Sequence, residues 1–314
     1  MKKTKKIKII VIIMTLLLLT TGCTKTLTDK NNKVVKNEKT QQTLTENIVC
    51  QPTDKVSIKA YEENGVKIKK LPKCEDFKIT SGKYEGLWNS FLVKPLAFIL
   101  LTIGKILGFT GKYALSIIIV SLLIRLIAYP VTKKTALQSE LIKKAQPELN
   151  KIQKKYQGKE DQESMIKQNQ ETLMVYKKYN INPMAGCLFS MLQLPLFIAF
   201  FEAVQRTPAL FEDKFLGLQL GTTPSAGITT PTFYAYIILM LIIAATTFFS
   251  FKMNSTGNMQ DPSMKMMPLM MSGMIIVTAT FMPSALGIYW ATSNLFTIIQ
   301  NILVKRSKEA NGKA

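Results

Sequence analysis

Long apolar runs alternate with lysine-rich segments along most of this 314-residue chain. About 20 residues of apolar helix cross the hydrocarbon core of a bilayer, and several of the runs approach that length. The predicted membrane spans cover residues 112–130, 183–204, 233–251, 266–282 and 285–304. The pattern therefore predicts an all-α polytopic membrane protein with five transmembrane helices.

An earlier apolar run, residues 88–108, is expected to lie on the membrane surface. It begins at Trp88, carries Lys94 and Lys105, and is separated from the next run by too few residues for two full spans to turn around. Tryptophan and lysine side chains favour the headgroup level of a bilayer. If the N-terminus is outside, a single crossing places the next lysine-rich segment in the cytoplasm, as the positive-inside rule requires. We therefore predict an external amphipathic interface helix within residues 85–109.

Residues 131–182 contain 11 lysines against 6 acidic residues, which indicates a cytoplasmic location. Apolar side chains recur every three or four positions on both sides of Gly158, a pattern typical of two helices joined by a turn. We predict a cytoplasmic helical hairpin here, with Pro147 kinking or restarting its first helix. The cationic surface suits anionic lipid, ribosomal RNA or an acidic protein, although a solvated helix pair that only fixes membrane orientation also explains the charge.

The chain begins with a cationic segment and a short apolar run, which is the arrangement of a secretory signal peptide. The residues that follow resemble a bacterial lipobox: Leu19-Thr20-Thr21-Gly22-Cys23. We predict a lipoprotein signal peptide over residues 1–22. Cys23 then carries a diacylglyceryl group and an N-acyl chain such as palmitate at the mature N-terminus, on the outer face of the membrane. An uncleaved anchor with an incidental cysteine is the alternative.

Residues 23–84 are polar and rich in Lys, Thr, Asn and Glu, so we expect an external tether with a small structured patch. Cys50 and Cys74 both lie in it. Outside the membrane these two thiols can form a disulfide, but their spacing alone leaves the reduced state equally open. Cys187 begins an apolar run and is expected to be a small buried residue rather than a nucleophile, because the chain contains no histidine to activate it.

Composition narrows the classes of function. Hydrophobic residues make up 47% of the chain, and the formal net charge is +21. No helix-turn-helix, ribonucleoprotein or zinc pattern accompanies the lysines, so we attribute the charge to membrane topology rather than to nucleic-acid binding. The sequence has no histidine and no pair of carboxylates within the spans. It therefore favours neither an enzyme nor an ion-coupled transporter, and it predicts no cofactor and no metal site.

One residue breaks the apolar pattern of the first predicted span, SIIIVSLLIRLIAYP. Arg125 keeps its charge at any physiological pH, and a charge at this depth costs at least about 2.5 kcal/mol unless a counter-ion or water accompanies it. The one acidic residue within the five spans, Glu202, is expected at the opposite level of the membrane. We therefore predict that Arg125 faces a hydrated cavity open to the cytoplasm.

Further polar residues are expected in the cytoplasmic half of the spans, where they can line the same cavity. They are Ser121, Gln193, Ser293, Asn294, Gln300 and Asn301. Each one taken singly is more typical of interhelical hydrogen bonding. Their shared level favours a cavity that attracts a polar or acidic peptide segment.

Methionines cluster at the start of the fourth predicted span. They are Met264, Met266, Met267, Met270, Met271 and Met274. Flexible thioether side chains can form an adaptable wall for varied partners, but ordinary packing or lipid contact explains them more simply.

Three segments resemble, in order and spacing, the signature blocks of the YidC/Oxa/Alb membrane protein insertases. They read YALSIIIVSLLIRLIAYPVTKKTALQSELIKKAQPELNKIQKKY, YKKYNINPMAGCLFSMLQLPLFIAFFEAV and MKMMPLMMSGMIIVTATFMPSALGIYWATSNLFTIIQNILVKR. The resemblance covers residues 88–306, and the lipobox is similar to that of the lipoprotein form in Gram-positive bacteria. Arg125 occupies the position of the family's groove arginine, and Gln193 and Trp290 match other groove-associated positions.

The resemblance implies a five-span core over residues 110–306, with a groove closed to the outside and open to the cytoplasm and to lipid. It implies an insertase and chaperone for newly made small membrane proteins, working without nucleotide hydrolysis, alone or with the Sec translocon. Further expected partners are anionic lipids and the ribosome, the latter through the basic hairpin and the short basic tail 307–314. The expected location is the bacterial cell membrane, with the C-terminus in the cytoplasm. A membrane lipoprotein that scaffolds the assembly of other complexes is the alternative.

Overall fold

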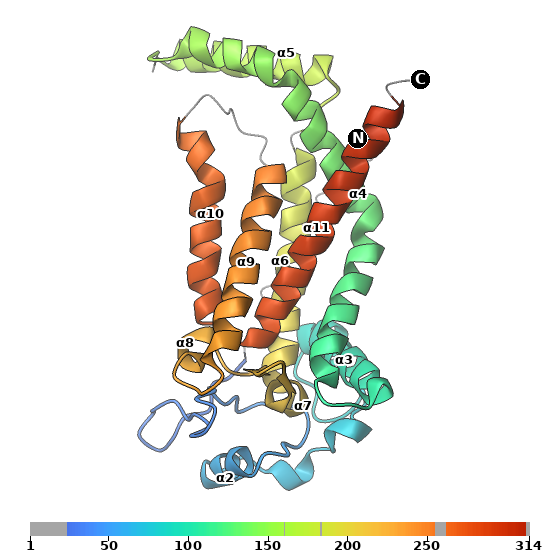
Figure 1. Ribbon diagram of the computed structural model, residues 1–314, viewed down its shortest axis with the longest axis vertical. Helices are drawn as coiled ribbons and strands as arrows, with labels where there is room; N and C mark the ends of the chain where they lie inside the picture. The colour runs from blue at the N-terminus through green and yellow to red at the C-terminus, as the bar shows by residue number, and fades with distance from the viewer. Residues whose placement is uncertain (1–23, 160, 183, 255–261, 312–314) are drawn as a thin grey trace. The chain divides into compact units, whose positions relative to one another are not determined.

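The computed structural model describes residues 24–159, 161–182, 184–254 and 262–311 (Figure 1). The predicted signal peptide and Cys23 lie outside these residues. The described chain forms two units, and each is described by itself. The first unit contains residues 24–122, 193–243 and 277–292, and the second contains the described residues of 123–192, 244–276 and 293–311.

Helices make up most of the described chain, which confirms the mainly helical class. The α-helices are α2 (Lys55–Glu63), α3 (Lys94–Leu107), α4 (Lys112–Tyr156), α5 (Gln162–Lys178), α6 (Met184–Arg206), α7 (Pro208–Glu212), α8 (Pro224–Gly227), α9 (Phe233–Asn254), α10 (Pro262–Thr280) and α11 (Ser284–Asn311). The shorter elements are the helical turns η1 (Ile68–Lys70), η2 (Cys74–Asp76) and η3 (Asn89–Val93) and the strands β1 (Lys214–Phe215) and β2 (Leu218–Gln219).

Three of the described helices are long and apolar enough to cross a membrane. They cover Asn89–Leu107, Lys112–Tyr156 and Phe233–Met253. Helices α4, α6, α9, α10 and α11 occupy the five ranges expected for spans. The number of spans, and the surface position expected for α3, stay predictions.

Helix α4 is longer than the sequence pattern suggested. It continues without interruption from the first predicted span into the lysine-rich segment, through Pro130 and Pro147. Pro147 therefore does not restart the helix, and the kink, the other outcome expected of it, stays a prediction. Proline lacks one backbone N–H, and the hydrogen bonds of the flanking turns are sufficient to keep the helix continuous.

Residues 24–84 form a folded layer in the first unit, which differs from the polar tether expected from composition. Its helix α2 begins after Asp54, whose carboxylate accepts a hydrogen bond from Ser57 N. Cys50 and Cys74 are joined by a disulfide with an S–S distance of 2.03 Å. The apolar core of this outer layer is formed by Leu27, Leu44, Ile48, Tyr61, Ile68 and Phe211.

The tether was predicted because the apolar residues of the outer layer are too widely spaced to show a helical or strand period. One member of the core, Phe211, belongs to α7, far along the chain. Figure 1 shows α2, α3, α7 and α8 gathered at one end of the first unit. The layer thus depends on residues that a local pattern does not reveal.

In the second unit, α5 packs against the last part of α4 as an antiparallel pair. The turn between them contains Gly158 at φ 79°, a left-handed conformation that glycine adopts without strain. The apolar core of this α4–α5 pair contains Ala145, Val175 and Ile181, with Leu141, Ile142, Leu149, Ile152, Tyr176 and Tyr179 packed against it.

Candidate functional site

The predicted groove residues are divided between the two units. Ser121, Gln193 and Trp290 belong to the first unit, and Arg125, Ser293 and Asn294 belong to the second.

In the first unit, Gln193 and Trp290 belong to one aromatic cluster between α6 and α11. Gln193 Nε2 donates a hydrogen bond of 2.8 Å to the Tyr289 hydroxyl. Tyr289 stacks on Phe200 with ring centroids 4.4 Å apart, and Phe197 meets Trp290 edge to face at 5.3 Å. The stacked rings hold the Tyr289 hydroxyl in place for Gln193. Sequence reasoning missed Tyr289, although its position next to Trp290 was a usable signal.

The hydroxyl of Ser121 is bonded within α4, whereas the sequence suggested that it lines a hydrated cavity. Its side chain is fully buried, and Ser121 Oγ donates a hydrogen bond of 2.6 Å to Ile117 O in the preceding turn of α4. A serine bonded to its own helix has satisfied its donor without water. The interpretation of Ser121 as a wall of a hydrated cavity therefore has no support from its contacts.

In the second unit, polar side chains pair between apolar helices. Asn294 Nδ2 donates to Thr247 Oγ1 at 2.9 Å, and Gln300 Nε2 donates to Thr132 Oγ1 at 2.8 Å. Such pairs are typical of helix packing inside membranes. Gln300, expected to line the cavity, is buried in this contact.

Ser293 and Arg125 are the residues of the second unit that suit a polar cavity best. Ser293 is only 3% exposed, and its hydroxyl has no hydrogen-bond partner among the described residues. A buried hydroxyl left in this state is a natural position for a water molecule. Arg125 is half-buried on α4.

The acidic residue of the predicted spans, Glu202, has a specific partner in the first unit. Its carboxylate is buried and accepts a hydrogen bond of 3.1 Å from Trp88 Nε1. Trp88 is fully buried within the protein, and its expected position at the headgroup level stays a prediction. Lys94, expected at the same level, is also buried, and its Nζ donates to Ser81 O at 2.6 Å and to Lys83 O at 3.2 Å.

A second buried charge fastens the outer layer to α6. Arg206 is 1% exposed, forms an ion pair with Glu85, and donates from Nε to Asn47 O at 2.8 Å. Its backbone carbonyl accepts a hydrogen bond from Val49 N at 2.8 Å.

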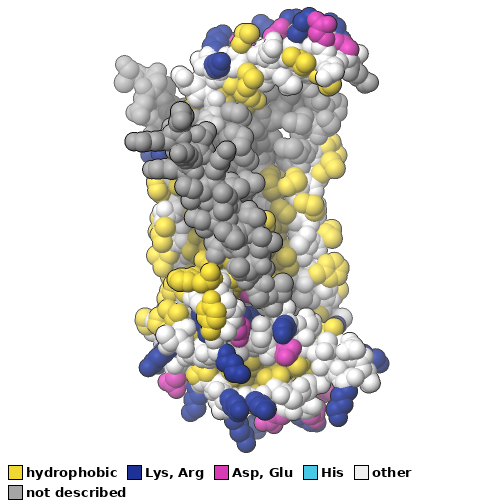
Figure 2. Space-filling view, turned by 180° about the vertical axis from the view of Figure 1, so that it is seen from behind, with side chains coloured by type: hydrophobic (Ala, Val, Ile, Leu, Met, Phe, Trp, Pro, Cys, Tyr) yellow, Lys and Arg dark blue, Asp and Glu magenta, His cyan; other side chains and the backbone are white. Residues whose placement is uncertain are grey.

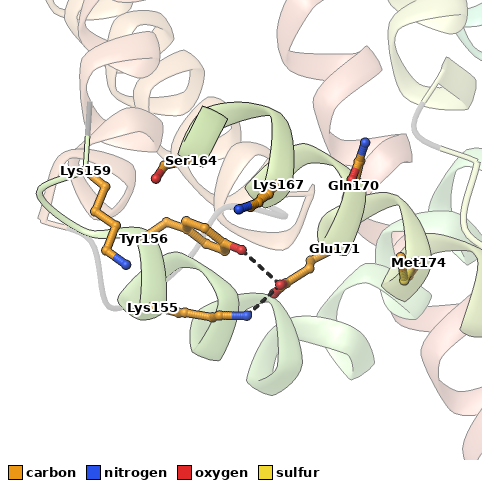
Figure 3. Close-up of a pocket in the computed structure, with 8 residues that line it drawn as sticks. All are labelled: Lys155, Tyr156, Lys159, Ser164, Lys167, Gln170, Glu171 and Met174. Atoms are coloured by element: carbon orange, nitrogen blue, oxygen red, sulfur yellow. Dashed lines mark hydrogen bonds and ion pairs between the residues drawn. The ribbon is translucent and has the colours of Figure 1, made fainter. Parts of the chain in front are cut away.

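The α4–α5 pair is held by two matched sets of polar contacts. Glu171 accepts hydrogen bonds from Lys155 Nζ at 2.6 Å and from the Tyr156 hydroxyl at 2.9 Å (Figure 3). Glu148 accepts in the same way from Lys178 Nζ at 2.6 Å and from the Tyr179 hydroxyl at 2.8 Å. The donated hydrogen bonds, from lysine first and then from tyrosine, lower the pKa of both carboxyl groups.

A cavity of about 470 Å³ opens beside the first of these sets (Figure 3). It is lined by Lys155, Tyr156, Lys159, Ser164, Lys167, Gln170, Glu171 and Met174. Three lysines against one carboxylate make its lining cationic.

The other predicted features are only partly described. The side chains of Cys187, Met264 and Met267 lie outside the described residues. Met266, Met270 and Met274 expose much of their surface, which suits lipid contact as well as a wall for clients. Among the described residues, no group of three or more His, Cys, Asp and Glu side chains forms a possible metal site.

Long apolar helices that pair polar side chains and carry a half-buried arginine define a polytopic membrane protein with polar contacts inside its helical region. A family model described as "60Kd inner membrane protein" matches residues 105–311. The chain therefore belongs to the YidC/Oxa/Alb family of membrane proteins, which is not a family of enzymes. The resemblance seen in the sequence is confirmed.

Relatives from bacteria agree with this assignment. The chain is 37% identical to "Membrane protein insertase MisCA" of Bacillus subtilis (strain 168) over 219 residues, which are 69% of this chain and 79% of the relative. It is 35% identical to "Membrane protein insertase YidC 2" of Listeria innocua over 232 residues, 72% of this chain and 76% of the relative. It is 38% identical to "Membrane protein insertase YidC" of Alkalihalophilus pseudofirmus over 218 residues, 69% of this chain and 81% of the relative.

Proposed function

We propose that this protein is a bacterial membrane protein insertase that moves newly made small membrane proteins from the cytoplasm into the lipid bilayer. The observation that carries the proposal is its membership of a family whose similar members are named membrane protein insertases. The most favourable energy change in insertion is the transfer of the client's apolar span into lipid. The protein therefore needs only to lower the barrier for the polar segment that crosses first, and nucleotide hydrolysis is not required.

The proposed route is a hydrated groove that carries Arg125 and is lined by Gln193 and Trp290. Support comes from the sequence match to the family's groove positions and from the half-buried position of Arg125. The buried Ser293 hydroxyl, which has no hydrogen-bond partner among the described residues, suits the same environment. A fixed cation in water within the membrane lowers the cost of bringing an acidic segment to that depth.

The proposed topology has five spans, an external interface helix and a cytoplasmic α4–α5 pair. The excess of lysine in residues 131–182 supports the cytoplasmic location of the pair. The exposed apolar side chains Phe91, Ile99 and Ile106 support contact of α3 with lipid. Cys23 would hold the lipid anchor on the outer face, because it ends a lipobox-like segment.

The proposed partners are the ribosome and the Sec translocon, and we infer them from the charge of the α4–α5 pair and from the kind of client. Membrane proteins leave the ribosome as they are made, and the basic α4–α5 pair and tail offer a surface for ribosomal RNA. Cooperation with the Sec translocon would supply clients with longer external segments. A client that needs neither partner should still insert.

Site-specific photocrosslinking tests the groove and the function together. Photoreactive residues at Arg125, Gln193 and Trp290 should capture a single-span client during its insertion, and the crosslinks should fade as the client moves into lipid. A probe at Leu241, an exposed apolar residue of α9, is the matched control and should give weak capture. Capture of assembled complexes alone, without any inserting client, would favour a scaffold lipoprotein instead.

A further inference from the structure

Helix α5 has a second apolar face that the α4–α5 pair does not use. Its buried face packs Val175 against α4. The large apolar side chains outside this contact are Met165, 49% exposed, Ile166, 51%, Leu173, 53%, and Met174, 65%. A run of exposed apolar residues along one helix is costly in water and usually marks a binding surface. We call these four residues the apolar face of α5.

Lysine side chains lie beside this apolar face. Of the 11 lysines in residues 131–182, four pair with described carboxylates, namely Lys143, Lys155, Lys167 and Lys178. Lys177 follows Leu173 by one helical turn and is exposed. The lysine-lined cavity of Figure 3 adjoins the same face, because Met174 belongs to both. Figure 2 shows lysine, acidic and apolar side chains together on this pair.

The α4–α5 pair is fastened at the ends of two apolar helices. Lys143 Nζ donates a hydrogen bond of 2.7 Å to Met253 O at the C-terminal end of α9. Asn182 N, just before α6, donates to Gln138 Oε1 at 2.7 Å. Within the second unit, Figure 1 shows α5 running across the direction of α10 rather than along it. If α9 and α6 cross the bilayer, the pair lies at the level where their ends emerge.

We propose that the apolar face of α5 binds the surface of the bilayer in which the protein sits, with the neighbouring lysines on the phosphates of anionic lipids. An amphipathic helix that combines exposed apolar side chains with flanking lysines matches such a surface in both properties. A partner protein would have to supply an apolar groove rimmed with acid, whereas the bilayer is already adjacent. The proposal rests on the cytoplasmic placement of the pair and not on the insertion activity.

Fluorescence of single reporter residues tests the contact in the full-length protein. An environment-sensitive fluorescent amino acid is placed at Ile166 or Leu173, and in a matched control at Gln157, an exposed polar residue of the turn between α4 and α5. Each protein is reconstituted in vesicles of phosphatidylcholine alone or of an equimolar mixture with phosphatidylglycerol, and the lipids carry brominated acyl chains. All three positions are exposed, so the core of the pair is unchanged.

We expect bromine quenching at Ile166 and Leu173 in the mixed vesicles, weaker quenching in pure phosphatidylcholine, and little at Gln157. Lys177→Gln should lower the lipid-contacting population about fivefold, since one lysine near an anionic surface contributes about 1 kcal/mol. Lys59→Gln, on exposed α2, should leave it unchanged. Equal quenching at all three positions, or protection from a soluble quencher without lipid quenching, would overturn the proposal, and the second result would indicate a protein partner. Neither result changes an insertion assay, so failure here is distinct from failure of the proposed function.

Discussion

Arg125 is the residue on which the proposed mechanism depends most. It is a permanent cation on an otherwise apolar stretch of α4 and is only half-buried. Substitution of a purely structural arginine should impair the insertion of all clients equally, whereas substitution of a groove arginine should impair the insertion of some clients more than others. The positive charge of Arg125 interacts strongly with a client only if the translocated segment of that client is itself charged.

Replacement of Arg125 should therefore act selectively. We expect Arg125→Ala to impair the insertion of clients with acidic translocated segments more than that of clients with neutral segments, while Arg125→Lys keeps much of the activity. Insertion of paired acidic and neutral versions of one client into vesicles measures the difference. Lys105→Ala, on the exposed side of α3, is a matched loss of one positive charge. Equal loss for both clients with Arg125→Ala would show that the residue is structural.

Glu212 should make the outer layer less stable as the pH rises, whereas a hydrogen-bonded carboxylate usually has the opposite effect. Its carboxylate accepts hydrogen bonds from Thr53 N at 2.8 Å, Thr53 Oγ1 at 2.7 Å and Asp54 N at 3.2 Å. Burial nevertheless raises the pKa of Glu212, and the nearby Asp54 raises it further against these hydrogen bonds. A raised carboxyl pKa means that the folded layer binds the proton more tightly than the unfolded chain does. The contribution of Glu212 therefore becomes less favourable as pH rises from the ordinary carboxyl range through the raised value.

Glu212→Gln should remove that dependence. We expect slower amide hydrogen exchange of residues 24–84 in the variant than in the wild type at neutral pH, and a difference that shrinks as the pH is lowered. Glu63→Gln, an exposed carboxyl of α2, is the control and should not alter the difference. The opposite trend, with the variant less protected at neutral pH, would mean that the hydrogen bonds to Thr53 outweigh the burial of the charge. The pKa of Asp54 is lowered, so its contribution to stability becomes more favourable as the pH rises. Asp54 is present in both the wild type and the Glu212→Gln variant.

At the scale of elements, the sequence located the long helices well and the outer layer poorly. Apolar runs reveal α4, α6, α9, α10 and α11 because each satisfies its backbone within itself and shows its length directly. The outer layer needs Phe211 from α7 to complete its core. The partners of Trp88 and Lys94 could not be predicted for the same reason, since they are remote or irregular: Glu202, Ser81 and Lys83.

In the candidate site, too, some features could be predicted from the sequence and others could not. Gln193 and Trp290 were predicted from their positions in family-like segments, whereas their cluster with Tyr289 depends on rings brought together from two helices. The hydrogen bond of Ser121 could not be predicted, because sequence does not show whether a serine hydroxyl bonds to its own helix. Spacing locates polar residues along a helix, but hydrogen-bond partners decide what they do.

Replacement of Arg206 should weaken the attachment of the outer layer. Arg206→Met leaves Glu85 without its cation and removes the hydrogen bond to Asn47 O, which should cost the attachment about 2 kcal/mol. Limited proteolysis of residues 24–84 in the membrane-embedded protein measures the loss. The double variant with Glu85→Gln should recover part of it because no uncompensated carboxylate remains. Identical cleavage of the wild type and Arg206→Met would show that the apolar core alone holds the layer.

At the scale of the whole molecule, the chain combines long apolar helices, an outer layer and a cationic α4–α5 pair, and neither the family nor the described residues suggest catalytic chemistry. Such a protein acts by changing the surroundings of another chain. The relatives named as insertases indicate which chain that is, a newly made membrane protein. Its energy source would be the transfer of the client's own apolar span.

Reconstitution is the most direct measurement of that activity. The purified protein is placed in vesicles without nucleotide, translocon or ribosome, and a small single-span client is added with its translocated end open to protease from outside. Vesicles that contain the protein should protect the translocated end, and vesicles that contain the Arg125→Ala variant should protect an acidic end less well. Equal protection in protein-free vesicles, or none with the wild-type protein, would contradict the proposal that this chain is an insertase.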